Sequence, residues 1–308
     1  MPTPKKLMLL VNPYSGRGLS KSALGDIVSR FAEGNYIVTV HITKDRNTAL
    51  LVREHSAEFD LIVCVGGDGT LSDVVSGLIL MGSDSPPPIG YIPMGTANDM
   101  ATTLALSRDI PTAVQTILDG RPVPLDIGCF AGGFFTYIAA FGAFTGVSYG
   151  TPQNAKRALG HLAYVFGGLA DIATIKPRHA VVEHDGGVIE DTLIFGGVTN
   201  STSVAGLVKL RPDDVDLSDG KFEVILVRNP VKPQDFVDIL TSVTNHTYVS
   251  DNVRLLHTSR VKFTFDDPVP WTRDGEDGGA HSEILIENRT RAVRIIIERP
   301  ATEDAPWL

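Results

Sequence analysis

Cysteine is scarce in this chain: two of its 308 residues are cysteines, Cys64 and Cys129. Both stand among apolar residues, which favours buried thiols, suited to a reducing compartment, over a disulfide between the two. Basic residues are also in the minority, with 27 against 36 acidic ones and a formal net charge of −9. Nucleic acid is therefore not expected as the main partner, because binding its phosphates requires a basic face.

The sequence also lacks a clear targeting or membrane-spanning segment. The apolar run at 7–11 is too short for a signal peptide. Residues 127–155 contain no charged side chain and are long enough to span a bilayer, but six of them are glycine. We expect residues 129–136 to form two strands around a Gly132-Gly133 turn, followed by a glycine-rich loop. A buried hairpin is therefore favoured over a transmembrane helix, and a soluble protein is expected.

The order of the predicted elements changes near residue 126. Up to that point strands alternate with helices, which predicts a mainly parallel sheet with helices on both faces. The strands are expected at 6–11, 36–42, 61–65 and 89–93, and the helices at 24–31, 47–54, 71–79, 100–106 and 111–120. We therefore predict a Rossmann-like three-layer α/β domain over residues 1–126.

After residue 126, strand-like runs are separated by Asp-Gly pairs, which are typical turn residues. The runs lie at 180–183, 193–199, 222–227, 261–265 and 292–298, and the Asp-Gly pairs at 185–186, 219–220 and 274–275. Helices are expected at 158–173 and 234–244. Residues 127–299 are thus predicted to form an antiparallel β domain, and the tail at 300–308 is mobile or packs back on the first domain.

The most informative motif is Gly66-Gly67-Asp68-Gly69-Thr70. It lies between an apolar run typical of a buried strand and apolar residues at helical spacing. Glycines let a phosphate approach the backbone, and the N–H groups and dipole of a following helix attract it. The carboxylate of Asp68 fits a divalent cation that accompanies phosphates. An ordinary turn in an α/β unit is the alternative.

A second polar loop follows the first predicted strand. Asn12, Ser15 and Gly16 could contact phosphate there, and Arg17 or Lys21 could supply positive charge. The same residues would also suit a common strand-to-helix turn.

A third loop, at 93–99, carries Thr96, Asn98 and Asp99 between a predicted strand and a helix. Asn98 or Asp99 could simply cap that helix. In an open parallel sheet, however, the loops after the strand C-termini line one crevice. The three loops together predict one site for a phosphate-bearing ligand.

Taken in order, these motifs resemble those of the soluble bacterial diacylglycerol kinase family, whose catalytic domain is shared with sphingosine and ceramide kinases. The Gly-Gly-Asp-Gly-Thr element also resembles NAD kinases and phosphofructokinases, whereas the Asn-Pro-x-Ser-Gly opening and the late Asp-Gly-Glu single out the lipid kinases. The matching segments lie at 12–16, 66–70, 93–99, 126–128, 219–220 and 274–276 and cover nearly the whole chain.

The resemblance implies an N-terminal nucleotide domain and a C-terminal β-sandwich, with the active site in the cleft between them. It also implies that ATP is held by Asn12, Ser15, Gly16, Gly66, Gly67, Asp68, Gly69, Thr70, Thr96 and Asn98.

For the chemistry, the resemblance implies that Asp274 is the general base that takes the proton from the lipid hydroxyl. Glu276 and Asp126 match acidic residues nearby, and Asp68 matches a residue linked to the catalytic Mg²⁺. Phosphoryl transfer depends on alignment and charge neutralisation, so a metal, backbone N–H groups and one base can suffice. Without the resemblance, Asp274 would be interpreted as a hairpin-turn residue.

A second, structural Mg²⁺ is implied at Asp219, completed by main-chain oxygens of Asp216 and Lys221. Asp219 alone would likewise be interpreted as a turn residue.

The lipid site is less distinct in the sequence. Phenylalanines at 134, 135, 141 and 144 could line an acyl-chain pocket or equally form the core of the sandwich. Lys156 and Arg157, followed by apolar residues, could touch a membrane surface, although an internal helix is favoured. Trp307-Leu308 could insert at an interface or be a frayed end.

The sequence thus predicts a cytoplasmic, Mg²⁺-dependent lipid kinase that visits the inner face of the membrane. It would transfer the γ-phosphate of ATP to a lipid alcohol, with diacylglycerol the favoured substrate and phosphatidic acid the product. A kinase for a sphingoid base, NAD or a sugar phosphate, and a non-catalytic lipid carrier on the same fold, remain alternatives. A homodimer through an edge strand is also open.

Overall fold

The computed structural model describes residues 3–18, 23–43, 47–142, 176–204, 208–248 and 250–299. They fall into two compact units. Unit 1 comprises the described residues of Met1–Ile127, Ser201–Gly220 and Arg289–Leu308, and unit 2 those of Gly128–Asn200 and Lys221–Asn288. The first boundary lies one residue from the expected position, whereas two later segments that the sequence assigned to the second domain lie in unit 1.

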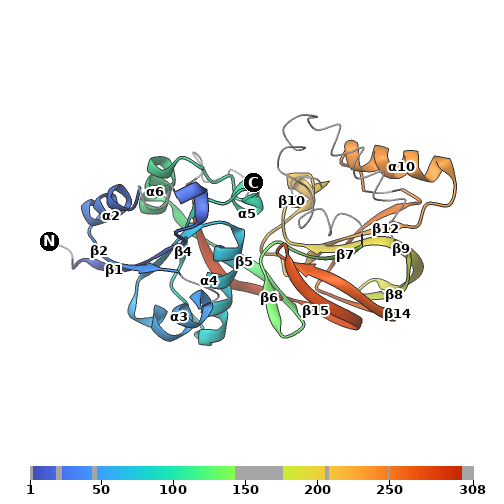
Figure 1. Ribbon diagram of the computed structural model, residues 1–308, viewed down its shortest axis with the longest axis horizontal. Helices are drawn as coiled ribbons and strands as arrows, with labels where there is room; N and C mark the ends of the chain where they lie inside the picture. Colours follow the sequence, from blue (N-terminus) through green and yellow to red (C-terminus); the bar gives the residue numbers. More distant parts are fainter. Residues whose placement is uncertain are drawn as a thin grey trace. The chain divides into compact units, whose positions relative to one another are not determined.

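Unit 1 is built around a parallel sheet in the order β2-β1-β3-β4-β15. The strands are β1 (Lys5–Val11), β2 (Tyr36–Ile42), β3 (Leu61–Gly66), β4 (Ile89–Pro93) and the end of β15 (Glu276–Ile297). Helices α2 (Leu24–Glu33) and α6 (Ile110–Asp119) cover one face, and α3 (Thr48–His55) and α4 (Asp68–Met81) cover the other (Figure 1). The predicted three-layer α/β architecture is confirmed.

The layers of unit 1 follow from the strand period of two. Along β1, Leu7, Leu9 and Val11 pack in one core cluster with Phe31 of α2 and Ile117 of α6. The intervening side chains point to the opposite face and are also fully buried. A central parallel strand therefore appears in the sequence as an unbroken apolar run.

Helix ends in unit 1 match several sequence signals. Gly34 follows the last residue of α2, and Pro111 lies in the first turn of α6. Asp109 caps α6 by accepting a hydrogen bond from the Thr112 N–H at 3.1 Å. Asn47 stands at the start of α3 as predicted, but its side chain makes no capping hydrogen bond. Two short 3₁₀ helices, η1 (Ser15–Gly18) and η2 (Ser56–Glu58), complete this part of the unit.

Unit 2 consists mainly of antiparallel strands. β5 (Arg121–Phe130) enters it from unit 1, and β15 leaves it for unit 1. The others are β6 (Gly133–Phe135), β7 (Ile138–Gly142), β8 (Arg178–His184), β9 (Gly187–Thr199), β12 (Phe222–Arg228), β13 (Val253–Thr258) and β14 (Arg260–Arg273). Among the described residues of this unit, Pro233–Thr244 form helix α10, which matches the helix expected at 234–244.

Two long strands give unit 2 its sandwich character. β9 pairs with β8 along its first part and with β7 along its second. β14 changes partners in the same way, from β8 to β7. Strands that switch partners form the corners of a β-sandwich, so the predicted sandwich is confirmed.

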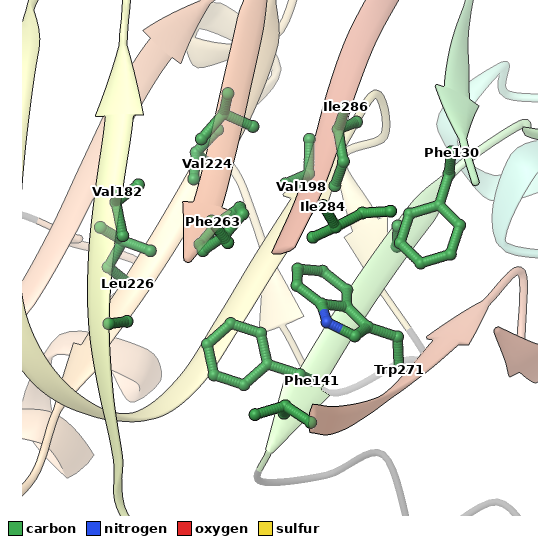
Figure 2. Close-up of a cluster of buried hydrophobic side chains, with 14 of the residues drawn as sticks. Phe130, Phe141, Val182, Val198, Val224, Leu226, Phe263, Trp271, Ile284 and Ile286 are labelled. Carbon is green, nitrogen blue, oxygen red and sulfur yellow. The ribbon is translucent and has the colours of Figure 1, made fainter. Parts of the chain in front are cut away.

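The core of unit 2 is rich in aromatic side chains (Figure 2). Trp271 lies at its centre, with ring centroids 4.9 Å from Phe141, 5.2 Å from Phe263 and 5.5 Å from Phe130. The Phe135 and Phe222 rings are also in contact, tilted by 31° with centroids 5.6 Å apart. Of the four phenylalanines considered for an acyl-chain pocket, those at 135 and 141 are therefore core residues, the one at 134 is partly exposed, and the one at 144 lies outside the described residues.

Some local predictions need correction. The turn between β5 and β6 is Ala131-Gly132 and not Gly132-Gly133, because both φ angles of this pair are positive, at 47° and 75°. The helix expected at 100–106 is the shorter α5 (Asp99–Thr103). The strand expected at 292–298 is the end of β15, which joins the parallel sheet of unit 1 beside β4.

Several predictions fall outside the described residues: the helix at 158–173, the Lys156-Arg157 segment, Lys21 and the tail at 300–308. Within the described part of the chain, no helix combines the length and the apolar character needed to cross a membrane.

Candidate functional site

In the parallel sheet of unit 1, the order in which the chain adds strands reverses between β1 and β3. From β1 the chain moves outward to β2 on one side, then returns to β3 on the other side of β1. At such a switch point the loops after the two neighbouring strands diverge and leave a crevice, which is the usual ligand site of an open α/β sheet. The loops found here are the two that carry Asn12 and the Gly66–Thr70 motif.

Hydrogen bonds join the three polar loops predicted from the sequence. The Asn12 side chain donates from Nδ2 to Thr70 Oγ1 at 3.2 Å. Asn12 Oδ1 accepts from the Tyr14 N–H at 3.0 Å, which shapes its own loop. The Met94 N–H donates to the Gly66 carbonyl at 2.7 Å, so the loop after β4 is also tied to the motif.

The glycines of these loops differ in what they are needed for. A Cβ on Gly95 would lie 2.6 Å from the Gly67 Cα, and one on Gly66 would lie 2.5 Å from Thr70 Oγ1. These glycines allow the loops to pack closely. A Cβ on Gly69, in contrast, would meet no atom within 4 Å. The open space beside Gly69, at the first turn of α4, fits an approaching phosphate.

Asn98 stands just before α5, but its side chain does not cap this helix. Its backbone is left-handed, with φ 55°, and its side chain accepts from the Gly95 N–H and donates to the Gly95 carbonyl, both at 2.8 Å. The side chain is buried and closes the loop on itself instead of capping α5. Thr96, at the tip of this loop, is exposed and accessible to a ligand.

The carboxylate of Asp68 supplies the cap that Asn98 does not. Its two oxygens accept hydrogen bonds from the backbone N–H groups of Asp99 at 3.1 Å and Met100 at 3.2 Å, at the start of α5. Asp68 is nearly buried and is itself the first residue of α4. The Gly-Gly-Asp-Gly-Thr motif therefore orders the loop after β4 through this side chain.

The donor set around Asp68 fits Mg²⁺ only with help from phosphates. No cluster of three or more His, Cys, Asp or Glu side chains that could hold a metal occurs in the ranges that the structure describes. Mg²⁺ in phosphotransfer sites is commonly held by one or two carboxylates together with phosphate oxygens and water. Asp68 could provide one such carboxylate.

Sequence analysis missed a buried polar network beside α5. Ser203 donates from Oγ to Asp99 Oδ1 at 2.7 Å, and the hydroxyls of Thr103 and Ser201 lie 2.6 Å apart. All four side chains are buried. The segment 201–203 shows no motif or periodicity in the sequence, and only its packing against α5 reveals its part in the site.

Asp126, predicted to be catalytic, is fully buried in the middle of β5. Its carboxylate accepts from the N–H groups of Gly220 and Arg291, both at 2.6 Å. Both of these residues have positive φ, at 83° and 52°. The Asp126 side chain therefore fixes the turn that contains Asp219.

The residues implied for a structural Mg²⁺ lie on one exposed loop. Asp216 accepts from the Ser218 N–H at 2.9 Å, and Asp219 is exposed. The Lys221 carbonyl accepts from Asn288 Nδ2 at 3.1 Å. A site made of one carboxylate and main-chain oxygens here stays a prediction.

Asp274 and Gly275 form the two-residue turn between β14 and β15, with φ angles of 47° and 79°. This geometry is typical of a type I′ hairpin turn, for which Asp-Gly is a favoured pair. Asp274 is buried, however, and Glu276 after it is exposed. The relation of this turn to the nucleotide loops stays a prediction.

The Asp274 carboxylate accepts four hydrogen bonds from one segment, which connects β6 to β7 and includes the first residue of β7. Oδ2 accepts from the Thr136 N–H at 2.8 Å and from Thr136 Oγ1 at 3.0 Å, and Oδ1 accepts from the N–H groups of Tyr137 at 3.1 Å and Ile138 at 3.2 Å. Successive N–H groups that converge in this way form an anion-binding nest. They stabilise the ionised carboxylate.

Neither cysteine is placed for catalysis. Burial, and to a lesser extent the charges of Asp73 and Asp68, raises the pKa of the Cys64 thiol far above its ordinary value, so this side chain on β3 stays neutral. Cys129 is partly buried, and both are free thiols, as predicted.

Comparison with known protein families gives two matches along the chain. Residues 6–130 match the diacylglycerol kinase catalytic domain. Residues 145–297 match the YegS C-terminal NAD kinase beta sandwich-like domain.

Individual proteins agree with these matches. The chain is 33% identical to a diacylglycerol kinase of Bacillus subtilis (strain 168) over 97% of this chain and 98% of that protein. It is 36% identical to a diacylglycerol kinase of Staphylococcus epidermidis over 72% of this chain and 70% of that protein. A crystal structure from Bacillus anthracis str. Sterne has the same fold, with a TM-score of 0.81 at 23% identity over 98% of this chain and 99% of its own.

Proposed function

This chain belongs to the diacylglycerol kinase family of ATP-dependent lipid kinases, and we propose that it transfers the γ-phosphate of ATP to the hydroxyl of diacylglycerol, giving phosphatidic acid. The observation that supports an ATP site is the meeting of the Asn12 loop and the Gly66–Thr70 motif at the switch point of the unit 1 sheet, where the Asn12–Thr70 hydrogen bond joins them. The Met94–Gly66 hydrogen bond ties the loop after β4 to the same motif. The open space beside Gly69 leaves room for the phosphates.

In the proposed reaction the lipid hydroxyl oxygen bonds to the γ-phosphorus while the bond from that phosphorus to the β,γ-bridging oxygen breaks. ADP leaves, and the hydroxyl proton passes to the carboxylate of Asp274. The hydrogen-bond nest around Asp274 supports this role because it keeps the side chain ionised and fixed in direction. A positioned base of this kind contributes about 10²–10⁴-fold in rate.

The other acidic residues have supporting parts in this proposal. Asp68 would contribute one carboxylate to the catalytic Mg²⁺, which neutralises charge on the phosphates when bound. Asp126 would act indirectly by holding the Asp219 turn. Asp219, with main-chain oxygens of Asp216 and Lys221, would hold a second, structural Mg²⁺, and Glu276 would add negative charge next to the base.

The proposed substrate places the reaction at a membrane surface. We propose a cytoplasmic enzyme that associates transiently with the inner face of the membrane, where its lipid resides. Co-sedimentation with vesicles containing diacylglycerol tests this, and binding that does not depend on the lipid would argue against it. A homodimer remains a prediction, which sedimentation velocity can decide.

A transfer assay with γ-labelled ATP tests the proposed function. The acceptor panel is diacylglycerol, sphingosine, NAD and fructose 6-phosphate, with Asp274→Asn as the inactive control. Label should pass to diacylglycerol and require Mg²⁺. Transfer to NAD in preference to the lipids would overturn the substrate assignment, and lipid binding without any transfer would favour a non-catalytic carrier.

A further inference from the structure

The Asp274 nest contains donors of two kinds. Three of the four described are backbone N–H groups, from Thr136, Tyr137 and Ile138, and their positions are set by the chain around β6 and β7. The fourth is the Thr136 hydroxyl, a side-chain donor to Oδ2 at 3.0 Å.

The hydrogen bond between the Thr136 hydroxyl and Asp274 is buried, and the backbone around it is fixed. Thr136 is 1% exposed and Asp274 is 7% exposed, so water does not compete freely for the contact. The backbone at Asp274 is pinned as well, since its N–H donates to the Ile138 carbonyl at 2.9 Å. The Thr136 side chain can therefore be altered without removing what holds the turn.

We propose that Thr136 is a positioning residue for the phosphoryl transfer, whose hydroxyl orients Asp274 Oδ2 and keeps it unprotonated and able to accept the lipid proton. This inference rests on the proposed role of Asp274 as general base. A hydrogen bond to the charged form of a carboxylate favours that form, so the base stays active to lower pH than it would without the hydroxyl.

Other ionisable groups near the turn must remain constant in a test. The Tyr137 hydroxyl lies 3.4 Å from the position of a Cβ on Gly275, and the Arg273 side chain packs against Gly133. Glu276 and Asp277 begin β15. Substitution of Thr136 leaves all of these in place.

The experiment compares pH profiles of kcat/KM at saturating Mg²⁺ and ATP, with the lipid alcohol that the acceptor panel identifies. Thr136→Val is nearly isosteric and removes only the hydroxyl donor. We expect the midpoint of its acid limb to rise by about 0.5–1.5 pH units, because the lost bond had favoured the unprotonated base. Well below the midpoint, activity should fall about 3–30-fold relative to the unaltered protein.

Two control variants separate this effect from general loosening. Thr136→Ser keeps the hydroxyl and should restore the original midpoint. Thr199→Val removes another buried hydroxyl, which donates to the Tyr137 carbonyl at 2.6 Å in the same segment, and should leave the midpoint unchanged. Thermal melts of all variants show whether each is folded.

The outcomes are distinct. If Asp274→Asn retains full activity, the proposed base is wrong, and the inference fails with it. If Asp274→Asn is inactive while Thr136→Val has the original midpoint, the base assignment stands and the role of Thr136 is overturned. An equal shift in Thr199→Val would also overturn it.

Discussion

Asp68 in unit 1 and Asp274 in unit 2 are fixed by the same kind of hydrogen bond, but they stand in different local structures. Each carboxylate accepts backbone N–H groups from a segment far away in the sequence. Asp68 stands where a buried parallel strand gives way to the 14-residue helix α4. Asp274 stands in a two-residue turn between antiparallel strands. The sequence signal for the first is specific, whereas Asp-Gly also occurs in turns without chemistry.

A second Asp-Gly turn shows how much the surroundings decide. Asp185, between β8 and β9, accepts from the Ser259 N–H at 2.6 Å and hydroxyl at 2.8 Å. These bonds lower the pKa of its carboxyl, but the residue lies at the surface. Burial and an inward-facing nest, and not the dipeptide, distinguish Asp274.

The largest effect that would separate these turns is expected from Asp274→Asn. We expect kcat to fall by about 10²–10⁴-fold, because an amide cannot take the lipid proton. The ATP dissociation constant should stay within about threefold, since the nucleotide loops lie in unit 1. Asp185→Asn is the matched control and should keep its activity. Steady-state transfer measures kcat, and stopped-flow nucleotide binding measures the ATP dissociation constant. A similar fall in kcat for both variants would show that the two turns do not differ in function.

The next effect concerns the aromatic core of unit 2. Phe141→Ala should lower the free energy of unfolding by about 3–5 kcal/mol, because a fully buried ring is lost from its contacts with Phe263, Phe265 and Trp271. Val188→Ala, at an exposed position, should change it by about 0.5 kcal/mol or less. Denaturant titration measures both. A higher KM for lipid at unchanged stability would instead support an acyl-chain pocket.

A smaller effect tests whether unit 1 reserves space for phosphate. Gly69→Ala should raise the KM for ATP at least about tenfold without loss of stability, because the new methyl group occupies open space in the first turn of α4. Gly25→Ala, in the first turn of α2 and equally uncrowded, is the control and should leave KM unchanged. If Gly69→Ala binds ATP normally, phosphate does not lie there.

The smallest effect is the pH dependence of the Asp185 turn. Its pKa is lower in the folded state, so its contribution to stability is present above the unfolded value of about 3.9 and is lost as pH falls through the folded pKa. The Tm difference between the unaltered protein and Asp185→Asn should therefore shrink on acidification below pH 4. Because the residue is exposed, the difference is expected to be small at every pH. A difference that grows in acid would contradict this.

The fold of unit 1 was largely predictable, because its strands and its helices differ in the spacing of their apolar residues. The unbroken apolar run of β3 is of strand length and is followed directly by glycines, and the apolar residues of α4 recur at helical spacing. That residues 201–220 and the end of β15 belong to unit 1 could not be predicted. An apolar strand such as 292–298 has the same pattern whichever sheet it joins.

The candidate site was predictable as a set of motifs but not as a set of contacts. Glycine loops after strands indicated where phosphate binds, and topology supports that location. That Asp68 caps α5, that Asn98 closes its own loop and that Thr136 faces Asp274 depend on pairings across 31, 3 and 138 positions of the chain. Of these, only the short-range one lies within reach of local sequence patterns.

The path of the chain through the two units has a consequence for biosynthesis. The polypeptide passes between them at 127–128, 200–201, 220–221 and 288–289. The strand that completes the parallel sheet beside β4 is thus synthesised long after β4 itself, since Ile295 pairs with Ile89. Nascent chains that have not reached residue 289 would expose the flank of β4, so we expect chaperones to engage unit 1 until this strand has emerged.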